Sequence, residues 1–144
     1  MKKIILSLAG IFAMTFAAVA DDKPIPFDKL PLEAKTFINV NFQNVKVLYT
    51  VQDNDLIFPE YTVALENGFK VQFTNGGALE KIESNGPAIA ENLIPYQIRD
   101  YVKLHYPDAT FKEYEIGKKS YEVKLSNRLD LTFNKKFQLI EIDD

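Results

Sequence analysis

Residues 61–82 read YTVALENGFKVQFTNGGALEKI, and residues 121–142 read YEVKLSNRLDLTFNKKFQLIEI. With an offset of 60 residues, seven of these 22 positions are identical. Further upstream the offset is 64, which pairs Leu30-Pro31 with Ile94-Pro95 and Phe42 with Tyr106. The four-residue difference falls around residues 53–59. The sequence therefore predicts a duplication, with a first copy in residues 21–83, a linker in 84–92 and a second copy in 93–144.

Each copy is expected to begin with a helix. Apolar residues recur with helical spacing in both copies, at Leu30, Ala34, Phe37, Ile38 and Phe42, and at Ile94, Ile98, Tyr101, Val102 and Tyr106. A proline stands in the first turn of each helix, where its missing N–H is tolerated. Asp28 and Asn92 are the candidate capping residues.

Four strands are expected after each helix. Alternation of apolar and polar residues predicts them at 45–52, 61–66, 69–74 and 78–83, and again at 109–117, 119–126, 129–134 and 137–142. Asn67-Gly68 is a strong signal for a two-residue hairpin turn. Leu79 and Ile82 have opposite parity, which indicates a β-bulge or a strand covered on both faces.

The predicted fold class is therefore α+β. It consists of two tandem copies, each a helix followed by a four-stranded antiparallel meander, with the helix packed on one sheet face. Two arrangements stay open at this point: the two sheets join edge to edge, or they pack separately.

The first 20 residues match a secretory signal peptide. Lys2 and Lys3 precede an uncharged apolar run, which ends at Ala18-Val19-Ala20, and we expect cleavage after Ala20. The run is shorter than the ~20 residues that a transmembrane helix needs. No cysteine follows the cleavage site, so the lipoprotein route is excluded. The predicted location is the periplasm or the exterior, without a membrane span after cleavage.

Composition narrows the possible activities. The chain has 144 residues, one histidine, no tryptophan and no cysteine, which excludes disulfides, thiolate catalysis and thiolate metal sites. Without Lys2 and Lys3, the 17 basic residues become 15 against 20 acidic ones, a net charge of −5. An acidic chain argues against nucleic acid as a partner.

The catalytic inventory is poor, and we predict that the protein is not an enzyme and holds no cofactor or metal. His105, the only histidine, is expected at a helix end, where hydrogen bonding explains it. The paired carboxylates are Asp53 with Asp55, Glu113 with Glu115, and Asp143 with Asp144. None has apolar surroundings that would separate the two pKa values, as a hydrolase needs. Asp53-Asn54-Asp55 lacks the later glycine and glutamate of a calcium loop.

The remaining candidate for a functional site is the exposed surface of the predicted sheet. The strand alternation places several polar residues and three apolar ones on an outward sheet face. Apolar anchors in a polar field are typical of protein-binding surfaces, although scattered apolar residues are also ordinary on any surface. The predicted partner-binding residues are Leu48, Thr50, Lys112, Tyr114, Ile116 and Lys124.

The repeated Leu30-Pro31 and Ile94-Pro95 starts, with Tyr61-Thr62-Val63 and Tyr121-Glu122-Val123, resemble the PepSY-like, beta-lactamase-inhibitor-like proteins exported by Bacteroidetes. The resemblance covers both copies. It implies a non-enzymatic protein that inhibits or restrains a partner in the cell envelope through its sheet face. The chain lacks the disulfides and tryptophan-rich face of true beta-lactamase inhibitors, which weakens that part of the analogy.

Two alternatives to protein binding remain. One is a lipid or peptide binder with a pocket between helix and sheet, lined by Phe37, Phe73, Tyr101 and Phe133. The less favoured one is a carboxylate-based hydrolase, which would need two acids in one cleft.

Overall fold

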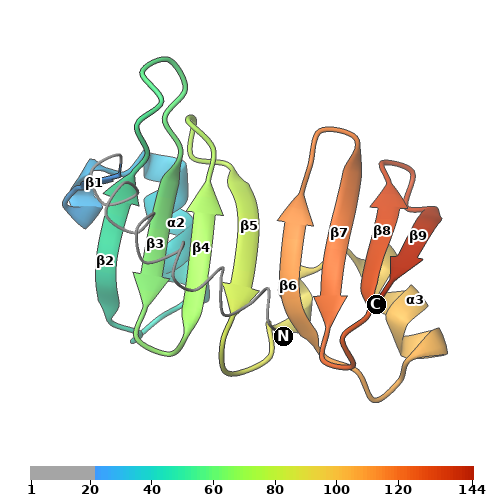
Figure 1. The fold of residues 1–144 in the computed structure, drawn as a ribbon. Helices are drawn as coiled ribbons and strands as arrows, with labels where there is room; N and C mark the ends of the chain where they lie inside the picture. The colour runs from blue at the N-terminus through green and yellow to red at the C-terminus, as the bar shows by residue number, and fades with distance from the viewer. Residues whose placement is uncertain (1–21) are drawn as a thin grey trace, which may run out of the picture.

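The computed structural model describes residues 22–144. The predicted signal peptide and its cleavage site therefore lie outside the described residues. Nine strands form one antiparallel sheet in which every strand pairs with its neighbours in the chain (Figure 1). The strands are β1 (Lys23–Pro24), β2 (Val47–Gln52), β3 (Tyr61–Leu65), β4 (Phe69–Phe73), β5 (Leu79–Ser84), β6 (Phe111–Ile116), β7 (Ser120–Leu125), β8 (Asp130–Asn134) and β9 (Leu139–Asp143).

Two short helices, α2 (Leu32–Asn41) and α3 (Tyr96–His105), lie behind the sheet on the same face (Figure 1). Pro31 and Pro95 are their N-cap residues, without any side-chain capping bond. The predicted caps Asp28 and Asn92 are wrong, since they lie in the preceding 3₁₀ turns η1 (Phe27–Lys29) and η2 (Glu91–Leu93). Neither helix, nor any other among the described residues, is long and apolar enough to cross a membrane.

The predicted fold class is wrong. The protein is one nine-stranded antiparallel sheet with two short helices, not two helix-plus-meander units. The joint between the two halves is the pairing of β5 with β6, in which Ile82 lies opposite Tyr114. An unpaired strand edge leaves backbone N–H and C=O groups without partners, and the two inner edges satisfy each other by pairing. Strand β1, which the sequence analysis did not predict, extends the sheet beyond β2.

The core lies between the sheet and the helices. One row of register partners crosses the sheet on the helix face and is almost completely buried: Val63, Val71, Ile82, Tyr114, Val123 and Leu131. Aromatic rings pack each helix against the sheet beside this row. Phe37 meets Phe73 edge to face at 5.7 Å between centroids, and Tyr101 meets Phe133 in the same way at 5.6 Å.

Four β-bulges set which side chains face the core. In β5 and in β9 the register shifts by one residue, at Glu80 and at Ile140. The bulge that the opposite parity of Leu79 and Ile82 predicts is thereby confirmed. The other two bulges, at Leu48 in β2 and at Lys112 in β6, were not predicted. A bulge reverses the alternation after it, which decides the position of the predicted site residues.

Candidate functional site

The bulges at Leu48 and Lys112 turn two of the predicted partner-binding residues into the core. Thr50 lies opposite Val63 and is 4% exposed, and Tyr114 lies opposite Val123 and is also 4% exposed. The prediction that these two side chains lie on the outward face is wrong, because it assumed unbroken alternation along both strands. Burial raises the pKa of Tyr114 to about 12.

The other four predicted residues are scattered. Leu48 and Lys124 are exposed, whereas Ile116 packs against the core. The Lys112 ammonium donates a hydrogen bond to the carbonyl oxygen of Gly86. The six residues therefore do not form one surface, and their role in binding stays a prediction.

The outward face of the sheet is strongly acidic from β5 to β9. Residues in register share a face, and the rows that alternate with the buried row point away from the helices. We call their carboxylates the acidic face: Glu83, Glu113, Glu115, Glu122, Asp130, Glu141 and Asp143. On the same strands these rows contain two amines, Lys81 and Lys124. Most of this negative charge is therefore uncompensated on its own surface.

Like charges perturb each other on this face. The side chains of Lys81 and Glu113 form a salt bridge of 3.5 Å across the β5–β6 joint. Partial burial, followed by the nearby carboxylates Glu115 and Asp130, raises the pKa of Glu122. Burial and the charge of Glu60 raise the pKa of Glu80 in the same way. A cationic partner would relieve this repulsion.

A protruding loop joins β2 to β3 and extends beyond the end of these strands in the first half of the sheet (Figure 1). Its base is closed by Asp53, whose N–H donates to the Glu60 carbonyl at 3.0 Å and whose carboxylate accepts the N–H groups of Asp55 and Glu60 at 3.1 Å. The Asp55 carboxylate accepts the N–H groups of Phe58 and Ile57 at 3.0 and 2.9 Å, and these bonds lower the pKa of Asp55. Such turns fix the loop without any core of its own.

Three consecutive apolar side chains form the end of the loop. Leu56, Ile57 and Phe58 are 95%, 73% and 64% exposed, and we call them the apolar tip. Asp53 and Glu60 at the base act electrostatically on Glu80, and so does Glu115 from the acidic face. The loop base and the acidic face are therefore electrostatic neighbours.

The apolar tip is the feature that the sequence analysis missed. The loop's two aspartates, Asp53 and Asp55, were weighed as a catalytic pair and as a calcium loop, and the three apolar residues that follow them were not considered as a surface. Two signals mark it: three apolar residues in a row outside any strand, and an insertion that only one half of the chain carries. An exposed apolar cluster of this kind is typical of an interaction site.

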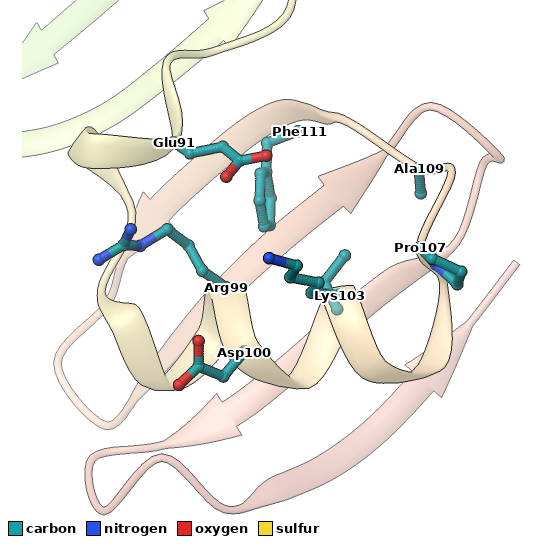
Figure 2. Close-up of a pocket in the computed structure, with 8 residues that line it drawn as sticks. Glu91, Arg99, Asp100, Lys103, Pro107, Ala109 and Phe111 are labelled. Atoms are coloured by element: carbon teal, nitrogen blue, oxygen red, sulfur yellow. The ribbon is translucent and has the colours of Figure 1, made fainter.

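A small charged hollow lies beside α3 (Figure 2). It has a volume of about 220 Å³, and Glu91 and Lys103 extend toward it while Phe111 lies at its back. The Arg99 Nε donates to the carbonyl oxygen of Ile94 at 3.0 Å. The hollow is smaller than the ~300 Å³ at which ligand pockets usually begin.

An apolar groove of about 670 Å³ follows the outer side of α2. Leu32, Phe37, Val40 and Leu79 supply its apolar lining, and Gly77 also lines it. In the second half of the chain Phe137 stands at the position of Gly77 and stacks on Tyr121, with 4.9 Å between the rings.

The carboxylate pairs do not meet in a cleft. Asp53 and Asp55 hold the loop, and Glu113 and Glu115 lie on the open sheet face. His105 is exposed at the end of α3, stacked on Tyr101 at 4.2 Å. Within residues 22–144, no three histidine, aspartate or glutamate side chains are grouped so as to hold a metal ion.

Comparison with known proteins gives one family and several solved structures. The model of a family described as "Putative beta-lactamase-inhibitor-like, PepSY-like" matches residues 18–81 and 59–141. A comparison with curated proteins finds no match.

Three solved structures from Bacteroides are similar along nearly their whole length. One, from Bacteroides thetaiotaomicron, is described as a putative calcium-regulated periplasmic protein; it is 40% identical over 85% of this chain and 97% of its own, with a TM-score of 0.82. Two putative periplasmic proteins from Bacteroides vulgatus are 36% and 27% identical. They cover 88% and 85% of this chain and 99% of their own, with TM-scores of 0.83 and 0.80.

Proposed function

We propose that this chain, which belongs to the PepSY-like family, is a non-enzymatic periplasmic protein that binds a basic partner protein. The binding surface consists of the apolar tip and the acidic face, which are linked through the loop base, since Glu60 and Glu115 both act electrostatically on Glu80. The similar solved structures are described as putative periplasmic proteins, and residues 1–20 match a signal peptide, which together support the location.

The observation that carries the proposal is the apolar tip. Leu56, Ile57 and Phe58 lie outside the hydrophobic core, yet the carboxylates of Asp53 and Asp55 hold the loop that presents them. A loop already fixed in one shape loses little conformational entropy on binding. Apolar anchors that enter a partner's pocket commonly dominate the energy of an interface.

The charge of the acidic face would determine which partner binds. Complementary charge raises the association rate and excludes partners of the same sign, and its effect falls as salt screens it. We therefore expect the partner to carry a basic rim around an apolar pocket. Inhibition or restraint of that partner is the mode of action that the family description suggests.

The absence of catalysis is part of the proposal. It is supported by the structural use of the carboxylates on the loop and by the open position of Glu113 and Glu115. Neither pair is enclosed with an apolar wall that would hold one acid protonated.

The proposal is tested by co-purification from envelope extract with the mature chain and two variants. The tip variant replaces Leu56, Ile57 and Phe58 by serine. The control variant, Leu104→Ser, removes a side chain that is equally apolar and 77% exposed, on α3. We expect the same partner with the wild type and the control and its loss with the tip variant. Equal capture by all three chains would refute the proposal.

A second candidate function, the binding of a small apolar ligand, is favoured by the groove along α2. The helix–sheet interface itself is filled by the edge-to-face pairs of Phe37 with Phe73 and Tyr101 with Phe133, so the ligand would lie outside the helix. A Val40→Asp change would abolish such binding and leave capture of the protein partner unchanged.

A further inference from the structure

The N-terminal strand β1 occupies on β2 the place that β5 occupies on β6. Strands β2 and β6 are equivalent, since each has a bulge followed by a buried residue, Thr50 in one and Tyr114 in the other. On β6, Ile82 lies opposite Tyr114. On β2, the N–H of Ile25 donates to the Thr50 carbonyl at 2.9 Å. Ile25 therefore occupies on β2 the position that Ile82 occupies on β6.

Strand β1 covers the edge of β2 and disfavours the pairing of any further strand. Ile25 packs against the hydrophobic core, as Ile82 does. Because successive N–H groups of a strand point to opposite sides, Pro24 and Pro26 occupy positions whose N–H groups would face outward. Proline has no N–H to offer, so the outer side of β1 is a poor template for a further strand.

At the opposite end of the sheet, β9 has the geometry of β5, but no strand covers its outer edge among the described residues. Strand β9 repeats β5: the bulge at Ile140 corresponds to that at Glu80, and Ile142 pairs with Leu131 as Ile82 pairs with Val71. Ile82 is fully buried beneath the β5–β6 joint, whereas Ile142 is 49% exposed.

We propose that β9 of one copy of this chain fits the β2 edge of a second copy, and that residues 23–25 are a cap that prevents this association. The repeat places Glu141 opposite Val51 and Ile142 opposite Thr50, in the register of the β5–β6 joint. Strand β2 brings no carboxylate to this contact, since its outward residues are Tyr49 and Val51. Two β9 strands would instead set Glu141 and Asp143 of both copies against each other, which charge repulsion opposes.

Such a contact joins different surfaces of the two copies and does not close on itself. Removal of the cap should therefore produce chains of increasing length rather than one defined oligomer. The intact protein should stay monomeric, because its own N-terminal residues occupy the acceptor edge.

The cap is tested on the mature chain with the substitution Ile25→Ser, and in parallel with a chain that starts at Phe27. Sedimentation velocity should show a mass that rises with concentration for both uncapped chains and a constant monomer mass for the intact one. Adding Ile142→Asp should restore the monomer, whereas Leu104→Asp, at an exposed apolar site on α3, should not. An uncapped chain that stays monomeric, or one whose association is indifferent to Ile142→Asp, overturns the proposal.

The register is tested by disulfide formation, since the chain has no cysteine of its own. One Ile25→Ser chain carries Val51→Cys and a second carries Glu141→Cys. We expect a mixed disulfide between them on mild oxidation, and far less when Thr62→Cys, one strand inward, replaces Val51→Cys. Equal yields from Val51→Cys and Thr62→Cys would contradict β9-on-β2 pairing, and binding of a basic peptide to β9 of the intact chain would identify a different occupant.

Discussion

The contact between Gly77 and the start of α2 permits a quantitative prediction. Gly77 has φ +95°, and an added Cβ atom would lie 2.8 Å from the Cβ of Pro31 and 3.2 Å from the backbone N of Ala34. The left-handed backbone costs a residue other than glycine about 1–2 kcal/mol. Displacing a proline ring and a helix backbone adds about 1–3 kcal/mol, as overpacking usually does. Gly77→Ala should therefore lower the free energy of unfolding by about 2–5 kcal/mol, a large share of a typical domain's ~5–15 kcal/mol.

The neighbouring glycine provides the matched control. Gly76 has no heavy atom within 4 Å of an added Cβ, so Gly76→Ala should be neutral or stabilise by up to about 1 kcal/mol. Urea unfolding followed by tyrosine fluorescence suits both variants, because the chain has seven tyrosines and no tryptophan. If the two variants differed by less than about 0.5 kcal/mol, the packing of α2 on the Gly77 turn would be wrong.

Three further predictions concern buried or perturbed groups. The Thr50 hydroxyl is buried without a hydrogen-bond partner, so Thr50→Val should raise the free energy of unfolding by about 1 kcal/mol in urea; a loss of stability would show that the hydroxyl is satisfied. The folded-state pKa of Glu122 lies above its ordinary value of 4.5, so ionisation costs stability above the folded pKa and the cost vanishes below the unfolded one. Glu122→Gln should therefore stabilise the protein at neutral pH and lose this effect below the ordinary pKa of 4.5, and an effect that grows on acidification would contradict the raised pKa of Glu122. The pKa of Tyr114, raised from 10.0 to about 12, predicts a late ionisation step in an absorbance titration, and Tyr114→Phe should remove that step.

Local elements of the fold were predictable from the residues. The helical spacing of Ala34, Ile38 and Phe42 and the turn at Asn67-Gly68 depend on contacts close in the chain, and both appear in the structure. The joining of β5 to β6 depends on an edge contact between residues 30 to 34 positions apart, for which no local pattern exists. The overall architecture was therefore mispredicted although its pieces were present.

The bulges explain the errors at the candidate site. Unbroken alternation along β6 would have turned Glu113 and Glu115 into the core, and carboxylates are almost never fully buried without a partner. That conflict was a readable signal of a bulge between Phe111 and Glu113. Around Leu48 no charged residue conflicts with unbroken alternation, so the sequence of β2 alone does not predict the burial of Thr50. That burial could be predicted only from the equivalence of Thr50 with Tyr114 in the repeat.

The measurement that most directly tests the proposed binding surface is carboxylate labelling of the mature chain, free and in complex with the partner that the wild type captures. A carbodiimide label read by mass spectrometry reports each aspartate and glutamate carboxylate separately. We predict that Glu115 and Glu122 on the acidic face, together with Glu60 at the loop base, are protected in the complex, while the exposed Glu66 and Asp108 label equally in both states. Unchanged labelling of Glu60, Glu115 and Glu122 in a complex that still forms would contradict binding through this surface.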